Sequence, residues 1–172
     1  MLRNHAVIIM SSEDFPTTIR NATVADIPAM MDLGATSRTA PQWNEQHYSR
    51  IFADDDGSRK VLVIEKNSRI LGFIVARGFS GEWEIENILV SPSDQRRGLA
   101  TQLLKEFMKS IPKNLPVSIF LEVREGNCAA RALYEKQGFQ PVGKRKSYYS
   151  GPEEDAIVYR IGNSINCTSP GA

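Results

Sequence analysis

This sequence has few cysteines and no long apolar run, and each absence removes a class of protein. Its two cysteines, Cys128 and Cys167, are too few for a disulfide framework and do not have the spacing of metal ligands, so a cytoplasmic location is expected. The apolar stretch from Ala6 to Met10 is shorter than the roughly 7 residues that a signal-peptide core needs. No stretch approaches the roughly 20 apolar residues of a membrane span, so no membrane partner is expected.

An excess of charge of one sign is missing as well. The 21 Lys and Arg residues are balanced by 20 Asp and Glu residues, which leaves a formal net charge of +1. Because nucleic-acid binding relies on neutralising phosphates with basic residues, no dedicated nucleic-acid binding is expected. The length of 172 residues suits one domain with one core. We expect this domain at residues 17–162, after a flexible tail or extra edge strand at 1–16 and before a polar tail at 163–172.

Hydrophobic patterning predicts alternating strands and helices between these tails, with no internal repeat. A helix begins at Thr23–Asp26, and its apolar residues Ile27, Met30, Met31 and Leu33 share one face. Further helices are predicted over 45–52, 98–110 and 128–137. Strands are predicted over 18–20, 61–65, 70–77, 82–90, 117–124, 140–149 and 155–161. The pattern indicates an α/β fold with a mixed central sheet of about six to seven strands, flanked by about four helices.

The strand predicted over 82–90 changes its apolar face partway along. Trp83 and Ile85 are at odd-numbered positions, whereas Ile88 and Val90 are at even-numbered positions, so the apolar face switches near Asn87. Either a β-bulge or burial of both faces at the end of the strand explains the switch. A bulge would have chemical value, because splayed strands leave backbone N–H and C=O groups free to hold a ligand.

The motif QRRGLA, Gln95 to Ala100, follows this strand directly. Gly98 and Ala100 allow a ligand to approach the backbone closely, and the next helix directs its unpaired N–H groups and positive dipole end there. The motif therefore predicts an anion site, with an ordinary turn into a helix as the alternative. The apolar residues of that helix, which are expected to face the core, are Leu99, Leu103, Leu104, Phe107, Met108 and Ile111.

The segment LEVREGNCAARALYEKQGF, Leu121 to Phe139, combines a strand end with a capped helix. Glu122 lies near the end of the strand, where open α/β sheets form ligand crevices, and could serve as a general base. An ion pair with Arg124 or with a neighbouring strand is the alternative. Asn127 suits the N-cap and Gly138 the C′ position of the helix. On spacing alone, Tyr134 is read as a core tyrosine, and the segment brings it within plausible reach of Glu122.

These motifs, followed by KRKSYY at 144–149 and EDAIVY at 154–159, resemble the GCN5-related N-acetyltransferase (GNAT) superfamily. Within it the sequence is most similar to the RimI group of ribosomal-protein-alanine N-acetyltransferases. The likeness covers residues 18–161. QRRGLA matches a signature that the whole superfamily shares, whereas LEVR, Asn127, LYEKQGF and the Tyr-Tyr pair are more specific to the group. The resemblance implies the GNAT fold with a bulged fourth strand, acetyl-CoA as cosubstrate and no metal.

The resemblance also assigns roles to particular residues. It implies that Glu122 is the proton acceptor and Tyr134 the proton donor, which favours catalytic roles over their structural alternatives. Asn127 would make a coenzyme contact. The strand backbone that would hold acetyl-CoA is Ile88, Leu89 and Val90, and the residues that would cradle its pyrophosphate are Arg96, Arg97, Gly98, Leu99, Ala100 and Thr101. Glu84 and Glu86 are rival bases, since some relatives carry the base on this strand.

The acceptor implied by the resemblance is the N-terminal alanine of a ribosomal small-subunit protein. A lysine, a polyamine or another small amine is an alternative, and a non-catalytic acyl-CoA-binding module is a third. The acceptor groove would lie between the loop at Trp43 and the strand pair with Tyr148 and Tyr149. Gln42 and Gly126 depart from the usual pattern of the group; the first departure bears on the acceptor. A monomer or weak dimer is expected.

The basic run Lys144, Arg145 and Lys146 has two readings. It could contact an acidic or ribosomal partner, or it could be the solvated face of a strand.

Overall fold

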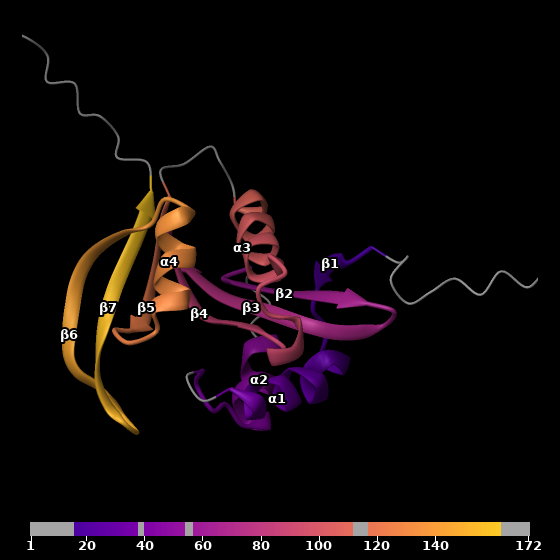
Figure 1. Ribbon diagram of the computed structural model, residues 1–172. Helices are drawn as coiled ribbons and strands as arrows, with labels where there is room; N and C mark the ends of the chain where they lie inside the picture. Colours follow the sequence, from indigo (N-terminus) through magenta and orange to yellow (C-terminus); the bar gives the residue numbers. More distant parts are fainter. Residues whose placement is uncertain (1–15, 38–39, 54–56, 112–116, 163–172) are drawn as a thin grey trace, which may run out of the picture.

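The computed structural model describes residues 16–37, 40–53, 57–111 and 117–162 (Figure 1). In this part the strands are β1 (Thr18–Asn21), β2 (Arg59–Lys66), β3 (Arg69–Phe79), β4 (Glu82–Val90), β5 (Ser118–Arg124), β6 (Gln140–Ser150) and β7 (Glu153–Gly162). The α-helices are α1 (Ile27–Thr36), α2 (Glu45–Ala53), α3 (Leu99–Ser110) and α4 (Cys128–Lys136). The predicted mixed α/β sheet and its flanking helices are confirmed.

The seven strands form one sheet in the order β1-β2-β3-β4-β5-β7-β6. Neighbouring strands are antiparallel except for β4 and β5, which are parallel and are connected through α3. A parallel pair needs a long crossover, and a helix is the usual one. The first predicted helix begins slightly later than expected, because Val24–Asp26 forms a 3-10 turn with a capping box before α1 begins at Ile27.

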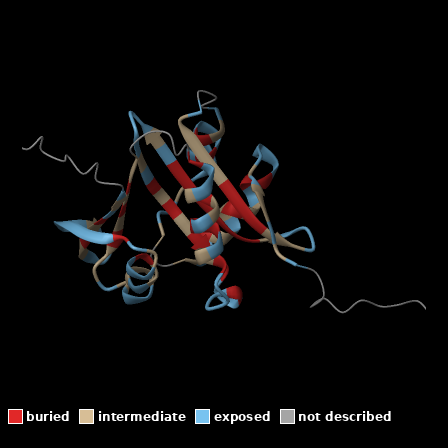
Figure 2. Cartoon of the chain, turned by 90° about the horizontal axis from the view of Figure 1, so that it is seen from above, coloured by how far each residue is buried: buried red, intermediate tan, exposed pale blue. Residues whose placement is uncertain are grey.

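Two apolar cores lie on opposite faces of the sheet. Alternate residues of β2 and β3, such as Ile64 and Ile74, pack with Leu103 and Phe107 of α3. The intervening residues pack under α1 and α2; these buried partners are Ile27, Met30, Tyr48, Ile51, Val63, Phe73, Val75 and Leu89. Figure 2 shows buried residues concentrated along the strands, with most exposed residues on the surrounding helices and loops. The apolar face predicted for α3 is confirmed.

The face switch in β4 comes from a β-bulge. Val75 of β3 is opposite Asn87, but the next residue, Ala76, is opposite Ile85, so Glu86 is the additional residue. Ile85 and Val90 consequently both reach the α3 core although their spacing is odd. Of the two explanations open at the sequence level, the bulge is correct.

The two terminal segments, predicted as an N-terminal tail or edge strand at 1–16 and a C-terminal tail at 163–172, lie outside the described residues except for Pro16. Within the described ranges, no helix is long and apolar enough to cross a membrane.

Candidate active site

The site begins where β4 and β5 separate. The two strands pair only from Glu82 to Ile85 and from Ser118 to Leu121. Beyond the bulge, the residues up to Val90 pair with β3 alone, and the end of β5 up to Arg124 pairs with β7 alone. The facing edges of the two strands therefore expose unpaired backbone groups, and the predicted coenzyme strand Ile88, Leu89 and Val90 forms one of these edges.

The loop into α3 is suited to an anion. Gly98 is the N-cap with φ 78°, a left-handed conformation that glycine adopts at little cost, and a Cβ added there would meet no atom within 4 Å. The backbone can therefore be approached closely at this point. The first N–H groups of α3, including those of Leu99, Ala100 and Thr101, have no intrahelical acceptor and point out of the N-terminus.

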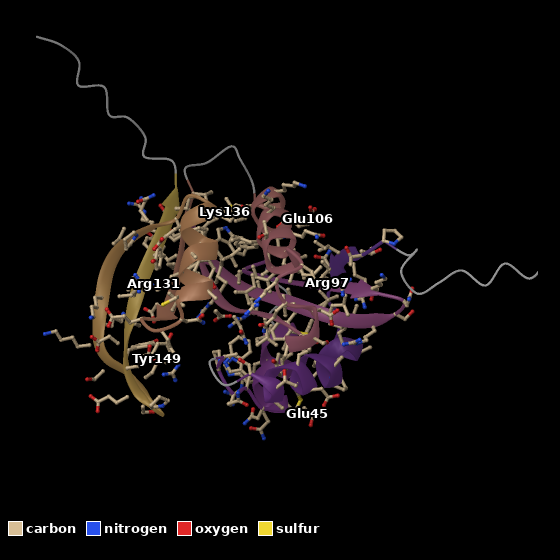
Figure 3. The ribbon with its side chains drawn as sticks, in the orientation of Figure 1. Glu45, Arg97, Glu106, Arg131, Lys136 and Tyr149 are labelled. Carbon is tan, nitrogen blue, oxygen red and sulfur yellow. The ribbon has the colours of Figure 1, made fainter. Side chains whose placement is uncertain are left out.

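A buried aspartate orders this loop. The Asp94 carboxylate is 2.8 Å from Arg97 and 3.2 Å from Arg69. Burial opposes its ionisation, but hydrogen bonds from Ser93 and Ser91 and the charges of the two arginines lower the pKa of Asp94. Arg97 is thus held beside the start of α3, as Figure 3 shows, whereas Arg96 is exposed with φ 61°.

Asn127 caps α4, as predicted: its Oδ1 accepts a hydrogen bond of 3.2 Å from the N–H of Ala130. The preceding Gly126 N–H donates to the Glu154 carboxylate at 2.5 Å, and a Cβ at Gly126 would lie 2.8 Å from that oxygen. The glycine that departs from the group's pattern therefore leaves room for a carboxylate from β7. This contact joins the turn before α4 to the β6–β7 hairpin.

Glu122 of β5 and Tyr134 of α4 lie on opposite faces of the sheet. Glu122 is on the face away from α3 and α4 and forms an ion pair with Arg145 of β6, 2.9 Å from Nε. Its carboxylate also accepts a hydrogen bond from Tyr148, which raises the pKa of that tyrosine. The alternative of an ion pair to a neighbouring strand is therefore present in the geometry.

Tyr134 is only 5% exposed and packs in the other core, with its ring 5.9 Å from Phe139 and 6.2 Å from Tyr159. Burial, together with the nearby Tyr149, raises the pKa of Tyr134, so its hydroxyl stays protonated at neutral pH. No hydrogen bond between Glu122 and Tyr134 occurs in the described part of the chain. Burial, followed by the charge of Glu122, raises the pKa of Tyr149 as well.

The side chain of Tyr149, labelled in Figure 3, is held by Arg124, a contact that sequence reasoning missed. The guanidinium lies 4.1 Å from the ring centroid of Tyr149 and donates to the carbonyl of Pro152 at 3.1 Å and to Glu154 at 3.2 Å. Arg124 is consequently not the partner of Glu122. The register of β6 and β7 is irregular between Arg145 and Tyr149, so strand alternation gave no signal for these neighbours.

The loop after α1 is anchored by Trp43 and Gln42. The indole of Trp43 stacks on His47 at 4.4 Å and meets Tyr48 edge-on at 5.6 Å. The Gln42 amide donates to the carbonyls of Gly34 at 3.2 Å and Ser37 at 3.0 Å. Both residues therefore anchor the loop on α1 and α2; residues 38–39 of this loop lie outside the described part.

The two rival bases differ sharply. Glu86 forms a largely buried ion pair with Arg59, which gives it a structural role. Glu84 is exposed at the wall of a pocket, and partial shielding from water and the charges of Glu122 and Glu86 raise the pKa of Glu84.

The basic run on β6 is largely paired. Lys144 contacts Glu125 and Asp155, each at 2.9 Å, and Arg145 contacts Glu122. These two charges therefore belong to intramolecular pairs, which supports the reading of a strand face over that of a free basic patch.

Comparison with known proteins gives a consistent result. The family described as "Acetyltransferase (GNAT) family" matches residues 27–139. The ribosomal protein bS18-alanine N-acetyltransferase of Escherichia coli (strain K12) is 32% identical over 147 residues, which cover 84% of this chain and 96% of that protein. An N-alpha-acetyltransferase of Saccharolobus solfataricus is 31% identical over 156 residues, which cover 83% of this chain and 92% of that protein. The crystal structure of the ribosomal-protein-S18-alanine N-acetyltransferase from Escherichia coli superposes with a TM-score of 0.78 and 27% identity, covering 91% of this chain and all of that one.

Proposed function

The chain belongs to the acetyltransferase (GNAT) family and is an N-acetyltransferase of the RimI type, and from this premise we propose that it acetylates the N-terminal alanine of a ribosomal small-subunit protein. Enzymes of the family take the acetyl group from acetyl-CoA. The observation that carries the proposal is the separation of β4 and β5, which exposes unpaired backbone between Glu122 on one face and Tyr134 on the other. We assign the catalytic domain to residues 17–162, acting as a monomer or weak dimer in the cytoplasm.

The chain offers a continuous surface for acetyl-CoA. The edge at Ile88–Val90 would bind the pantetheine arm by backbone hydrogen bonds, and the loop Arg96–Thr101 would bind the pyrophosphate. The open space at Gly98 fits this use, because a ligand phosphate can approach the N–H groups of α3 without meeting a side chain. Asn127, at the N-cap of α4, would make the further coenzyme contact.

Glu122 would remove a proton from the acceptor ammonium, directly or through water. The neutral amine nitrogen then attacks the thioester carbonyl carbon while backbone N–H groups of β4 donate to the carbonyl oxygen. As the C–S bond breaks, Tyr134 would give its proton to the departing sulfur. The tyrosine suits this role because burial keeps its hydroxyl protonated and the hydroxyl has no hydrogen-bond partner among the described residues. No metal ion is needed in these steps.

The acceptor class follows from proton energetics. An α-amino group has a reference pKa near 8 and a lysine side chain one near 10.4, so deprotonating lysine at neutral pH costs roughly 3 kcal/mol more. One carboxylate therefore suits an N-terminal amine well. Tyr148 and Tyr149 on one side and the loop at Trp43 on the other would hold the peptide backbone of the acceptor.

A peptide pair tests the proposal. One peptide carries the free N-terminal alanine of the ribosomal acceptor, and its twin has a blocked N-terminus and a free lysine. We expect acetyl transfer from acetyl-CoA to the first peptide only. Mass spectrometry of both peptides detects the added acetyl group. Equal labelling of both peptides would overturn the specificity for the α-amino group, and no labelling of either would leave the non-catalytic or small-amine alternatives.

A further inference from the structure

A pocket of about 580 Å³ lies directly beside Glu122, on the acceptor face of the sheet. It is bounded by parts of β3, β4, β5 and β7, beyond the area that α1 and α2 cover. Glu122 and Arg145 form one end. The rest of its wall is made by Arg77, Phe79, Glu82, Trp83, Glu84, Phe120, Leu121 and Val158. A peptide whose first amine lies at Glu122 therefore has this pocket within reach of its next side chains.

The pocket has an aromatic and acidic wall. Phe79 is 81% exposed at its rim, which is unusual for a large apolar residue, and Trp83 and Phe120 are half-buried beside it. Glu84 is opposite Phe120 in the parallel pairing and opposite Arg77 in the antiparallel pairing, so the three share one face. Phe120 already has the guanidinium of Arg160 5.7 Å from its ring centroid, so the exposed ring of Phe79 is the one that a further cation beside Glu84 can contact.

The charges of the wall do not cancel at Glu84. The guanidinium of Arg145 is held at 2.9 Å by Glu122, and no ion pair of Glu84 occurs among the described residues. Burial, followed by the repulsion of Glu122 and Glu86, raises the pKa of Glu84, while the charges of Arg145 and Arg77 act in the opposite direction. A cationic side chain would relieve that repulsion.

We propose that this pocket is a specificity subsite for a cationic side chain at the second or third residue of the acceptor, with Glu84 as its carboxylate. The inference rests on the proposed function, because it takes Glu122 as the place of the acceptor amine. Arginine fits better than lysine, since its planar guanidinium can contact Glu84 and lie against Phe79 at once. Glu84 is thus a binding residue for the acceptor rather than the base.

The test compares acceptor peptides that differ in one charge. Each peptide has an N-terminal alanine and either arginine or citrulline at the second or third residue; citrulline keeps the shape and removes the charge. We expect a three- to ten-fold higher kcat/KM for the arginine peptide at one of these positions, the size of a partly exposed charge pair. Glu84→Gln should remove the preference, and Arg77→Gln should increase it. Glu106→Gln, on α3 across the sheet, is the matched control and should leave it unchanged (Figure 3).

A binding measurement distinguishes failure of the proposed subsite from failure of the proposed function. The affinity of the CoA-bound protein for the same peptides is measured by calorimetry. Discrimination in binding without any acetyl transfer would sink the proposed function and keep the subsite. Transfer with equal rates for arginine and citrulline, or a preference that survives Glu84→Gln, would overturn the subsite and keep the proposed function.

Discussion

The two halves of the sheet are built differently. Strands β2 to β4 are covered on both faces, by α3 on one and by α1 and α2 on the other. In contrast, β5 and β7 are covered on one face only, and β6 is exposed along almost its whole length. The boundary between the halves is the separation of β4 from β5. Apolar burial therefore stabilises the first half, while the second half keeps a charged, accessible face, which is the one proposed for the acceptor.

The difference explains why polar contacts play unequal parts in the two halves. On the open face, Arg145 with Glu122 and Arg124 with Glu154 set the positions of the site residues. In the doubly covered half, the ion pair of Arg20 with Asp26 ties the start of α1 to β1. Substitutions in the first half should consequently change stability, and those in the second half should change activity.

The largest expected effect is on catalysis. Glu122→Gln removes the proposed base, and the transfer rate should fall about a thousand-fold, equivalent to about 4 kcal/mol, while the affinity for acetyl-CoA stays nearly unchanged. Steady-state kinetics with the alanine peptide measures it. The control is Glu125→Gln, three residues along on the surface. An unaffected rate would move the base to Glu84 or to solvent.

The next largest effect is on stability, and it differs between two phenylalanines of β3. Phe73 is fully buried under α1 and α2, so Phe73→Ala should lower the free energy of unfolding by about 3 to 4 kcal/mol. Phe79→Ala, at the exposed end of the same strand, should change it by less than about 0.5 kcal/mol. Urea denaturation compares the two. Similar losses for both would contradict the assignment of the stabilisation to the part of β3 that α1 and α2 cover.

A smaller effect is expected for Asp26, with a defined pH dependence. A hydrogen bond from Arg20 lowers the pKa of Asp26 from 3.8 to about 2, aided by the N–H and hydroxyl of Thr23. Because the folded pKa is below the unfolded one, the stabilisation is present above about pH 4 and is lost as the pH falls towards 2.

Asp26→Asn should therefore cost about 2 kcal/mol at pH 7, and the difference from the wild type should vanish near pH 2. Thermal or urea unfolding across this range measures it, with Asp32→Asn on the exposed side of α1 as control. A loss that stays constant with pH would show that the carboxylate charge is not the cause.

The smallest effect concerns the brace of Tyr149. Arg124→Gln should raise the KM for the acceptor about five- to ten-fold and leave the KM for acetyl-CoA nearly unchanged, since the guanidinium stacks on Tyr149 at 4.1 Å. Arg124→Lys should recover only part of the effect, because an ammonium lacks the planar fork.

Lys109→Gln is its control, since Lys109 is an exposed cation of α3 paired with Glu106, and it should leave both KM values unchanged. Equal increases in both KM values for Arg124→Gln would indicate a general structural role instead.

Most of the fold could be predicted because the patterns were local. The parity of β5, the apolar stripe of α3 and the cap at Asn127 depend on residues close in the chain, and each is confirmed. The change of apolar face within β4 also predicted the bulge, but only as one of two explanations. Pairing with β3 decided between them, since only the register shows that Glu86 is the additional residue.

The candidate residues of the site could be named from motifs, but their neighbours could not. Sequence alone determined the strand that carries Glu122 near its end, the helix that carries Tyr134 and the glycine turn before α3, because each is specified by short-range chemistry. Tertiary structure alone decided that Arg145 rather than Arg124 pairs with Glu122, that Glu86 is tied to Arg59, and that Glu84 faces a pocket. The two ion pairs join residues 23 and 27 positions apart, and the pocket joins residues farther apart still, so no local spacing specifies which charges meet.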